Sequence, residues 1–256
     1  MTQLTNYTKR LVDFLERMAQ TQAANLDDVA QRCADAVDRR GLVHLFGSGH
    51  SVIPVLDAFP RYGSFVGLHP LTDPRLMWHN VLGPGGVREL LWLEREENYV
   101  QQFLQHEPIN PGDVLIVYSH SGRNAAGIEA AIYARNREVF TVAVTSSANA
   151  DRPSVHSTGK NLTDVCDAVI DTGVPVEDAI ISIEGSDRPY GGSSTIVATV
   201  ISQEIITRTA AILVARGSKI STFVSPTVPG ASLSSNDDVF AAHRALIHEA
   251  TGKAIG

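Results

Sequence analysis

The chain has 256 residues, of which 43% are apolar, and carries a formal charge of −7. That length allows one large domain or two small ones with a sizeable core. The excess of acidic residues excludes the broad cationic surface with which proteins bind nucleic acid or anionic lipid. Cys33 and Cys166 have neither CxxC nor Cys/His spacing, so we predict no disulfide framework and no structural zinc site. No run of about 18 apolar residues and no signal-peptide pattern occurs, so we expect a cytoplasmic protein without contact to a membrane.

The first third of the chain predicts two helices and then a strand. Apolar residues recur at three- and four-residue steps from Leu4 to Met18, and a second helical stretch covers 26–39 and stops at Gly41. Residues 42–46 are typical of a short strand. The glycine loop, residues 47–51 (GSGHS), follows it and opens a helix that reaches about Tyr62.

The alternation continues through the rest of the chain. We predict strands at 64–68, 114–117, 139–144 and 168–171, helices at 94–106, 124–136, 193–215 and 237–250, and loops elsewhere, including one through Gly191-Gly192. Strands that alternate with helices pair in parallel through right-handed crossovers. We therefore predict one doubly wound α/β domain with helices on both faces of the sheet.

A second polar loop, the serine loop, covers residues 118–124 (YSHSGRN) between an apolar strand and a helix. The helix start offers unpaired backbone N–H groups and the positive end of the helix dipole, and Ser119 and Ser121 add hydroxyl donors. The carboxyl ends of neighbouring parallel strands face one crevice, so Ser51 and Thr145 should converge with these serines. The pattern predicts a site for a phosphate or carboxylate on a small metabolite.

Nucleotide binding is the first alternative for the glycine loop. The third glycine of a dinucleotide fingerprint would fall at Val52, the next strand ends without an acid for a ribose hydroxyl, and Gly159-Lys160 lacks the rest of a Walker loop. We therefore disfavour a nucleotide. A tight strand-to-helix turn without a ligand remains a second alternative.

Chemistry on a sugar needs a carboxylate to move a proton and a His or Lys to assist at oxygen. Asp57 and Arg61 are spaced i, i+4, and Glu94 and Glu97 are spaced i, i+3, so each pair shares a face of its predicted helix. A surface ion pair is the alternative for the first pair, and simple solvation is the alternative for the second.

The remaining polar candidates lie on loops. His50, His69 and His79 stand where strands end, and Lys160 of the polar loop 156–160 (HSTGK) could reach an anion, although a solvated lysine is the alternative. No HExxH or similar spacing occurs, so we predict no structural metal, with a loosely held ion left open.

Five motifs in this order resemble the sugar isomerase, or SIS, family of phosphosugar-binding proteins: LVHLFGSGHS, PGDVLIVYSHSGRN, AVTS, HSTGK and GGSST before a long helix. The chain is most similar to a poorly characterised single-domain branch. The resemblance implies a flavodoxin-like three-layer α/β sandwich with a five-stranded parallel core sheet, assembled as a homodimer or homotetramer. Residues 1–40 would be N-terminal helices, 41–216 the sandwich core, and 217–256 a tail and helix.

The resemblance also implies roles for individual residues. The serine-rich loop holds the sugar phosphate in the family, which corresponds here to Ser119, Ser121 and Asn124, joined by Ser51. Further binding candidates are Gly49, His50, Arg61, Thr145 and Lys160. Heptose-phosphate isomerases carry a His and a Glu where Asp57 and Arg61 stand, and a His near Gln203-Glu204, so their metal-assisted set is absent here.

We therefore predict an aldose–ketose isomerase that acts on a phosphorylated sugar without a cofactor. Glu94 or Glu97, with Asp57 as competitor, would shuttle a proton through an enediolate, while His79 or His50 assists ring opening. A lyase of the etherase kind would need the same base and stays open. A non-catalytic phosphosugar sensor is disfavoured, because the N-terminal helices lack a basic recognition face.

Overall fold

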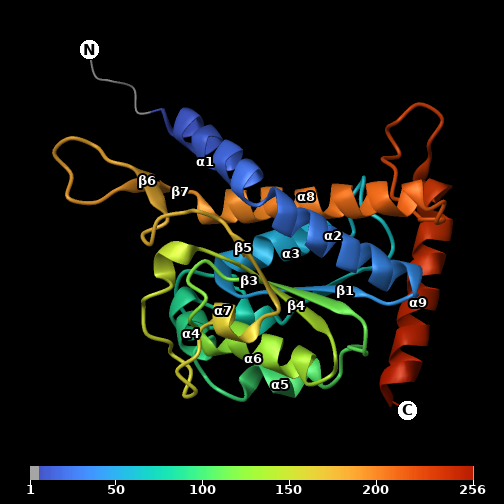
Figure 1. Ribbon diagram of the computed structural model, residues 1–256, viewed down its shortest axis with the longest axis horizontal. Coiled ribbons are helices and arrows are strands. Elements are labelled where there is room, and N and C mark those ends of the chain that lie inside the picture. The colour runs from blue at the N-terminus through green and yellow to red at the C-terminus, as the bar shows by residue number, and fades with distance from the viewer. Residues whose placement is uncertain (1–5, 256) are drawn as a thin grey trace.

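Five parallel strands form the centre of the protein, shown in Figure 1 as a computed structural model that describes residues 6–255. They are β1 (Val43–Gly47), β2 (Leu68–Leu71), β3 (Val114–Tyr118), β4 (Phe140–Thr145) and β5 (Ala168–Asp171), in the order β2-β1-β3-β4-β5. Every residue of β1 and β3 is buried, as expected for strands covered on both faces. From β1 the chain first adds β2 on one side and then β3, β4 and β5 on the other side. This change of side between β1 and β3 places a crevice outside the carboxyl ends of these two strands.

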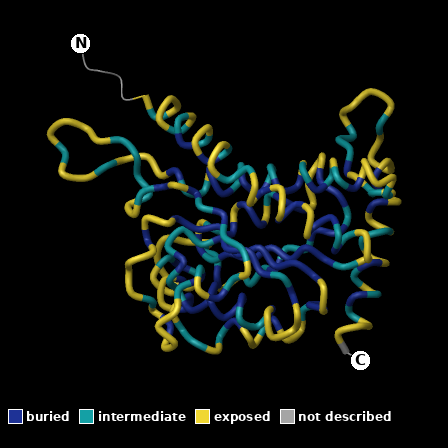
Figure 2. Tube along the Cα trace, in the orientation of Figure 1, coloured by how far each residue is buried: buried dark blue, intermediate teal, exposed yellow. Residues whose placement is uncertain are grey.

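Two layers of helices enclose the sheet (Figure 1). One layer holds α1 (Tyr7–Thr21), α2 (Ala23–Asp38), α3 (Val52–Ala58) and α8 (Ser194–Ala215); the other holds α4 (Val87–Leu93), α5 (Tyr99–Leu104), α6 (Ala125–Arg135) and α7 (Leu162–Val165). A separate hydrophobic core fills each side of the sheet, and Figure 2 shows the buried strands between them. The predicted three-layer α/β sandwich with helices at its N-terminus is confirmed.

The last helix, α9 (Asp237–Ile255), closes one end of the sandwich. Leu246 and Ala250 on this helix pack against Leu42, the residue before β1. The Asn110 side-chain amide also donates to the main-chain oxygen of Ala250 at 3.0 Å. The C-terminal helix is therefore packed at the amino-terminal ends of the central strands, opposite the carboxyl ends where the crevice lies.

Among the described helices, α8 is the one long and apolar enough to cross a membrane by length and composition. Val197, Ile201, Ile205 and Leu213 on this helix are nevertheless buried in the core of the sandwich. A core helix meets the same length and composition test.

Several local predictions were wrong. Of the helix expected at 94–106, only α5 (Tyr99–Leu104) is helical: α4 already ends at Leu93, and residues 94–98 form turns that end at Asn98, which has a left-handed conformation with φ of 66°. Glu94 and Glu97 therefore do not share a helical face. Strand β2 begins at Leu68 rather than at 64, and its proline, Pro70, is tolerated because β2 lies at the edge of the sheet.

Two further differences concern loops. Strands β6 (Ala179–Ile181) and β7 (Tyr190–Gly192) form an antiparallel hairpin inside the stretch predicted as a loop, and Figure 1 shows this hairpin extending away from the sandwich. The helix expected to reach Tyr62 ends at Ala58, just before Pro60. Leu4, the first residue of the predicted N-terminal helix, lies outside the described residues.

Candidate functional site

The glycine loop turns sharply where β1 ends. A Cβ atom on Gly47 would lie 2.1 Å from the main-chain oxygen of Ser51, so this close approach requires a glycine. Ser51 N–H donates to the oxygen of Ser48 at 3.1 Å, and a single 3₁₀ turn, Gly49–Ser51, leads into α3. The loop therefore presents Ser48 and Ser51 at the carboxyl edge of the sheet.

The serine loop forms an equally tight turn after β3. Gly122 has φ of 65°, and its N–H donates to the Oγ of Ser119 at 3.1 Å. Thr145, at the end of β4, supports the loop, because its Oγ1 donates to the oxygen of His120 at 3.3 Å. Asn124 is the N-cap residue of α6, yet its side chain makes no capping hydrogen bond. The Asn124 amide and the hydroxyl proton of Ser119 are thus available to an anion at the start of α6.

Ser51 and Ser119 face one small cavity, which the N-terminus of α8 closes. The cavity has a volume of about 10 Å³, and the polar residues that line it are Ser51, Tyr118, Ser119, His120, Thr172, Ser194 and Thr195. That is about the space of one water molecule, so a sugar does not fit inside it. Beyond Ser51 and Ser119, none of these residues was predicted from the sequence as a site residue.

His120 is the missed residue with the clearest chemical capacity. Its Nε2 contacts the main-chain oxygen of Val176 at 3.1 Å, and its Nδ1 is buried without a hydrogen-bond partner among residues 6–255. A buried ring nitrogen without a partner is costly unless a ligand or water supplies one. Its position between two serines of the predicted site was the signal that could have found it.

Glu94 lies between the glycine loop and the serine loop. Its side chain is buried, and its Oε2 accepts a hydrogen bond from the Oγ of Ser48 at 2.8 Å. Its main-chain oxygen accepts from the N–H of Ala126 at 3.0 Å, in the first turn of α6. Burial raises the pKa of the Glu94 carboxyl, and the Ser48 hydrogen bond and the nearby Arg95 oppose that rise.

Glu97 has a different role in the structure. Its two carboxylate oxygens accept from the N–H and the Oγ of Ser157, at 2.6 and 2.7 Å, and these hydrogen bonds lower its pKa. Glu97 thereby holds the polar loop 156–160. That loop adjoins the serine loop, because the flanking Val155 and Leu162 donate backbone N–H groups to Arg123 and Gly122. Lys160 itself is exposed.

Other predicted residues contact neighbours outside the two loops. Asp57 forms an ion pair with Arg61 and accepts from the side-chain amide of Gln203 on α8 at 2.9 Å. The structure therefore favours the ion-pair interpretation of Asp57 and Arg61. His50 is exposed and packs on the ring of Trp78 with 4.1 Å between centroids, and His79 is exposed on the loop before α4.

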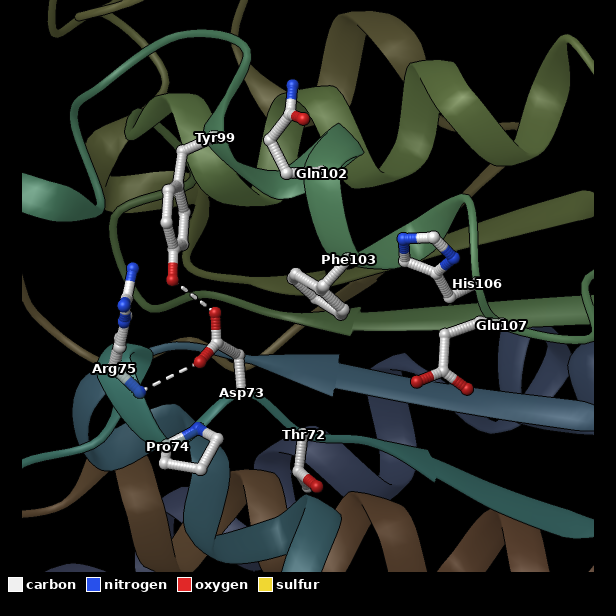
Figure 3. Close-up of a pocket in the computed structure, with 9 residues that line it drawn as sticks. All are labelled: Thr72, Asp73, Pro74, Arg75, Tyr99, Gln102, Phe103, His106 and Glu107. Carbon is white, nitrogen blue, oxygen red and sulfur yellow. Dashed lines mark hydrogen bonds between the residues drawn. The ribbon is translucent and has the colours of Figure 1, made fainter.

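A second, larger cavity of about 410 Å³ lies beyond the end of β2 (Figure 3). Asp73 lies in this cavity and accepts hydrogen bonds from the hydroxyl of Tyr99 and from the N–H of Arg75. Glu107 and His106 lie at the other side of the cavity. None of the site residues predicted from the sequence lines it.

Comparison with known proteins identifies the family. The model of the SIS domain matches residues 6–146, which is more than half of the chain. The chain therefore belongs to the SIS domain family, as the motifs predicted. A UPF0309 protein of Listeria monocytogenes serotype 4b is 34% identical over 203 residues, which are 79% of this chain and 80% of the relative. A UPF0309 protein of Geobacillus kaustophilus is 32% identical over 229 residues, 89% of each chain.

A solved structure shows the same fold. Phosphoheptose isomerase GmhA from Neisseria gonorrhoeae matches 80% of this chain and 95% of its own, with a TM-score of 0.53. The two sequences are 14% identical, so this likeness concerns the fold.

Proposed function

We propose that the chain binds a sugar phosphate and that the serine loop holds the phosphate group. Three features support the proposal: membership of the SIS family, the start of α6 behind the loop, and the available side chains of Ser119, Ser121 and Asn124. Ser121 and Asn124 are partly exposed. Because the inner cavity has only about 10 Å³, the proposal places the ligand on the solvent side of the loop.

We further propose that the protein is an aldose–ketose isomerase with Glu94 as the general base. The observation that carries this proposal is the position of Glu94, a buried carboxylate hydrogen-bonded to the glycine loop and joined by its main chain to the first turn of α6. A raised pKa makes a carboxylate a stronger base when it is ionised.

The proposed reaction moves one proton between carbon atoms and one between oxygen atoms, and it conserves the atoms of the substrate. Glu94 takes the proton from C2 of the open aldose, the electron pair of the broken C–H bond forms the enediolate, and the proton returns to C1 while the O2 hydroxyl proton passes to O1, which gives the ketose. His120 is the proposed group for the hydroxyl or ring oxygen, because it lies in the serine loop between Ser119 and Ser121 and its Nδ1 has no hydrogen-bond partner among residues 6–255. His50 and His79 are less suited, because they are exposed and have other neighbours.

Deuterium exchange tests the proposal. A panel of sugar phosphates is incubated with the protein in D₂O, and NMR follows exchange at C2. We expect exchange with at least one ligand, and a loss of about 10²- to 10⁴-fold in Glu94→Gln, the range typical of a general base. Glu96→Gln, a neighbouring carboxylate, is the matched control and should retain the rate.

Two results would contradict the proposed isomerase activity. A ligand that binds without any exchange would indicate a sensor of sugar phosphates. A product of lower mass in ordinary water would indicate a lyase, because isomerisation conserves mass.

A further inference from the structure

Three side chains from distant parts of the sequence meet beside the polar loop 156–160. They are Glu97 between α4 and α5, Glu129 in α6, and His156 in the loop itself. The Nε2 of His156 lies 3.9 Å from Oε2 of Glu97 and 3.8 Å from Oε1 of Glu129. One ligating atom from each residue lies within 4.8 Å of the other two. Two carboxylates and an imidazole thus face a common point.

The polar side chains of this cluster are largely buried, and one of their oxygen atoms lacks a hydrogen-bond partner among the described residues. The side chain of Glu129 is only 5% exposed and that of His156 only 8%. The Oε2 of Glu129 is buried and has no hydrogen-bond partner in the part of the chain that the structure describes. A buried carboxylate oxygen without a partner, next to a second carboxylate, is costly unless a cation or a proton neutralises it.

Each of the three side chains is held by a hydrogen bond from outside the cluster. The N–H of Asn98 donates to Oε1 of Glu129 at 2.6 Å, and Ser157 donates twice to Glu97. The Nδ1 of His156 lies 2.8 Å from the Oγ1 of Thr158, which leaves Nε2 as the atom aimed at the carboxylates. Metal ligands in proteins are oriented by partners of this kind.

We propose that Glu97, Glu129 and His156 bind a divalent transition-metal ion. Imidazole and carboxylate ligands suit Zn²⁺ and Mn²⁺, and a water molecule would complete the coordination. Ligands bound to tetrahedral Zn²⁺ at about 2.0–2.2 Å lie about 3.4 Å from each other. The three side chains therefore need to close by small movements only. Sequence spacing predicted no metal because the three ligands come from three separate elements.

A metal ion bound by Glu97, Glu129 and His156 would hold together the elements that surround the proposed phosphate site. Glu97 belongs to the same turn as Glu94, Glu129 to the helix that the serine loop opens, and His156 to the segment that contacts the serine loop through Val155 and Arg123. Metal binding here does not depend on the proposed isomerase activity, and the two can fail separately.

A proton is the alternative to the metal. Burial raises the pKa of Glu129, so a shared proton among the three groups would also relieve the repulsion. A direct measurement of metal binding distinguishes a bound metal ion from a shared proton.

The test is a titration of the full chain with Co²⁺ after treatment with a chelator, followed by visible absorption, and a competition with Zn²⁺. We expect one equivalent of Co²⁺ with tetrahedral or five-coordinate absorption, displaced by Zn²⁺. Glu129→Gln and Glu97→Gln retain acceptors for Asn98 and Ser157, and each should weaken binding by at least about 100-fold. Glu107→Gln, which removes the carboxylate 3.7 Å from His69, is the matched control and should bind as the wild type does.

Two results would overturn the proposal: a wild-type chain that takes up no stoichiometric Co²⁺ or Zn²⁺, or variants that bind either ion as tightly as the wild type. Should Glu129→Gln fail to fold, Glu97→Gln decides the matter, because its side chain is 32% exposed.

Discussion

Glu94 and Glu97 are three residues apart but have opposite environments. Burial raises the pKa of Glu94, whereas hydrogen bonds from Ser157 lower the pKa of Glu97. Carboxyl groups whose pKa values are pushed apart serve different roles. Glu94 suits proton transfer, and Glu97 suits a permanent negative charge that orders a loop or binds a cation.

The first prediction concerns Ser48, which positions Glu94. A base must be ionised, so kcat/KM should fall as the pH falls through the pKa of Glu94, which lies above its ordinary value of 4.5. The Ser48 hydrogen bond lowers that pKa, so Ser48→Ala should raise it and move the acid limb to higher pH. The pH profile of kcat/KM measures this shift. An acid limb that stays in place or moves to lower pH would contradict the assignment of Glu94.

The second prediction concerns Gly122 in the serine loop. An added Cβ would lie 2.9 Å from the Oγ1 of Thr145, and φ of 65° disfavours any other residue. We expect Gly122→Ala to lower the free energy of unfolding by more than the roughly 1–2 kcal/mol that left-handed backbone costs an alanine. Gly217→Ala isolates the backbone effect, because Gly217 also has positive φ but open space around it. Equal losses in urea unfolding of the two variants would show that the close contact is unimportant.

At the scale of elements, the N-terminus of α8 closes the inner cavity and is capped by Asp178. The Oδ1 of Asp178 accepts from the N–H groups of Ser193 and Ser194 at 2.8 and 2.5 Å. An acidic side chain at this position satisfies two helical donors and interacts favourably with the helix dipole. The cap thus fixes Ser194 and Thr195 against the serine loop.

The third prediction follows from that cap. Asp178→Ala should lower the free energy of unfolding by more than about 1 kcal/mol, the usual cost of losing an N-cap, because Asp178 also has φ of 65°, a backbone conformation that an alanine adopts at a further cost. Asp187→Ala, whose side chain is 92% exposed in the same segment, should change it little. Urea unfolding of the two variants checks the difference, and equal stabilities would exclude a capping role.

An element could be predicted where the local sequence pattern determines it, and not where it depends on a backbone conformation or a contact made in the fold. The buried strands β1, β3 and β4 were predictable, because a strand covered on both faces is a continuous apolar run. The break between α4 and α5 was not, because it depends on the backbone conformation of Asn98. The β6–β7 hairpin was missed since each strand has three residues and none of them is buried.

The residues of the candidate site could likewise be predicted only in part. Ser51, Ser119 and Thr145 could be placed together because parallel strands end at one edge of the sheet. Ser194 could not, because the approach of α8 is decided by packing over a long sequence separation. Glu129 was overlooked because it resembles an ordinary residue within a helix, and only the fold brings His156 against it.

At the scale of the whole molecule, the surface carries an apolar groove of about 480 Å³. Its lining includes Tyr62, Phe223, Leu233 and Phe240, and Leu233 is 86% exposed. Exposed apolar surface of this kind is typical of contacts between subunits. It is consistent with the homodimer or homotetramer that the family resemblance predicts.

The fourth prediction is therefore a self-associated chain. Sedimentation equilibrium should give two or four times the chain mass of 27.6 kDa, and Leu233→Asp should shift the protein toward lower mass. Lys219→Asp, a charge change elsewhere on the C-terminal part, serves as the control. A wild-type mass of 27.6 kDa at micromolar concentration would contradict the prediction.

The proposed function depends above all on the serine loop, which we propose binds the phosphate of a sugar phosphate. Its most direct test is isothermal titration of the ligand that gives the largest thermal shift in the panel, with the wild type, Ser119→Ala/Ser121→Ala and the exposed control Ser182→Ala. We expect binding by the wild type and the control, and a loss of affinity of at least about tenfold in the double variant, since each hydrogen bond to a charged group contributes about 1.5–3 kcal/mol. Unchanged affinity in the double variant, or no binding of any sugar phosphate by the wild type, would contradict it.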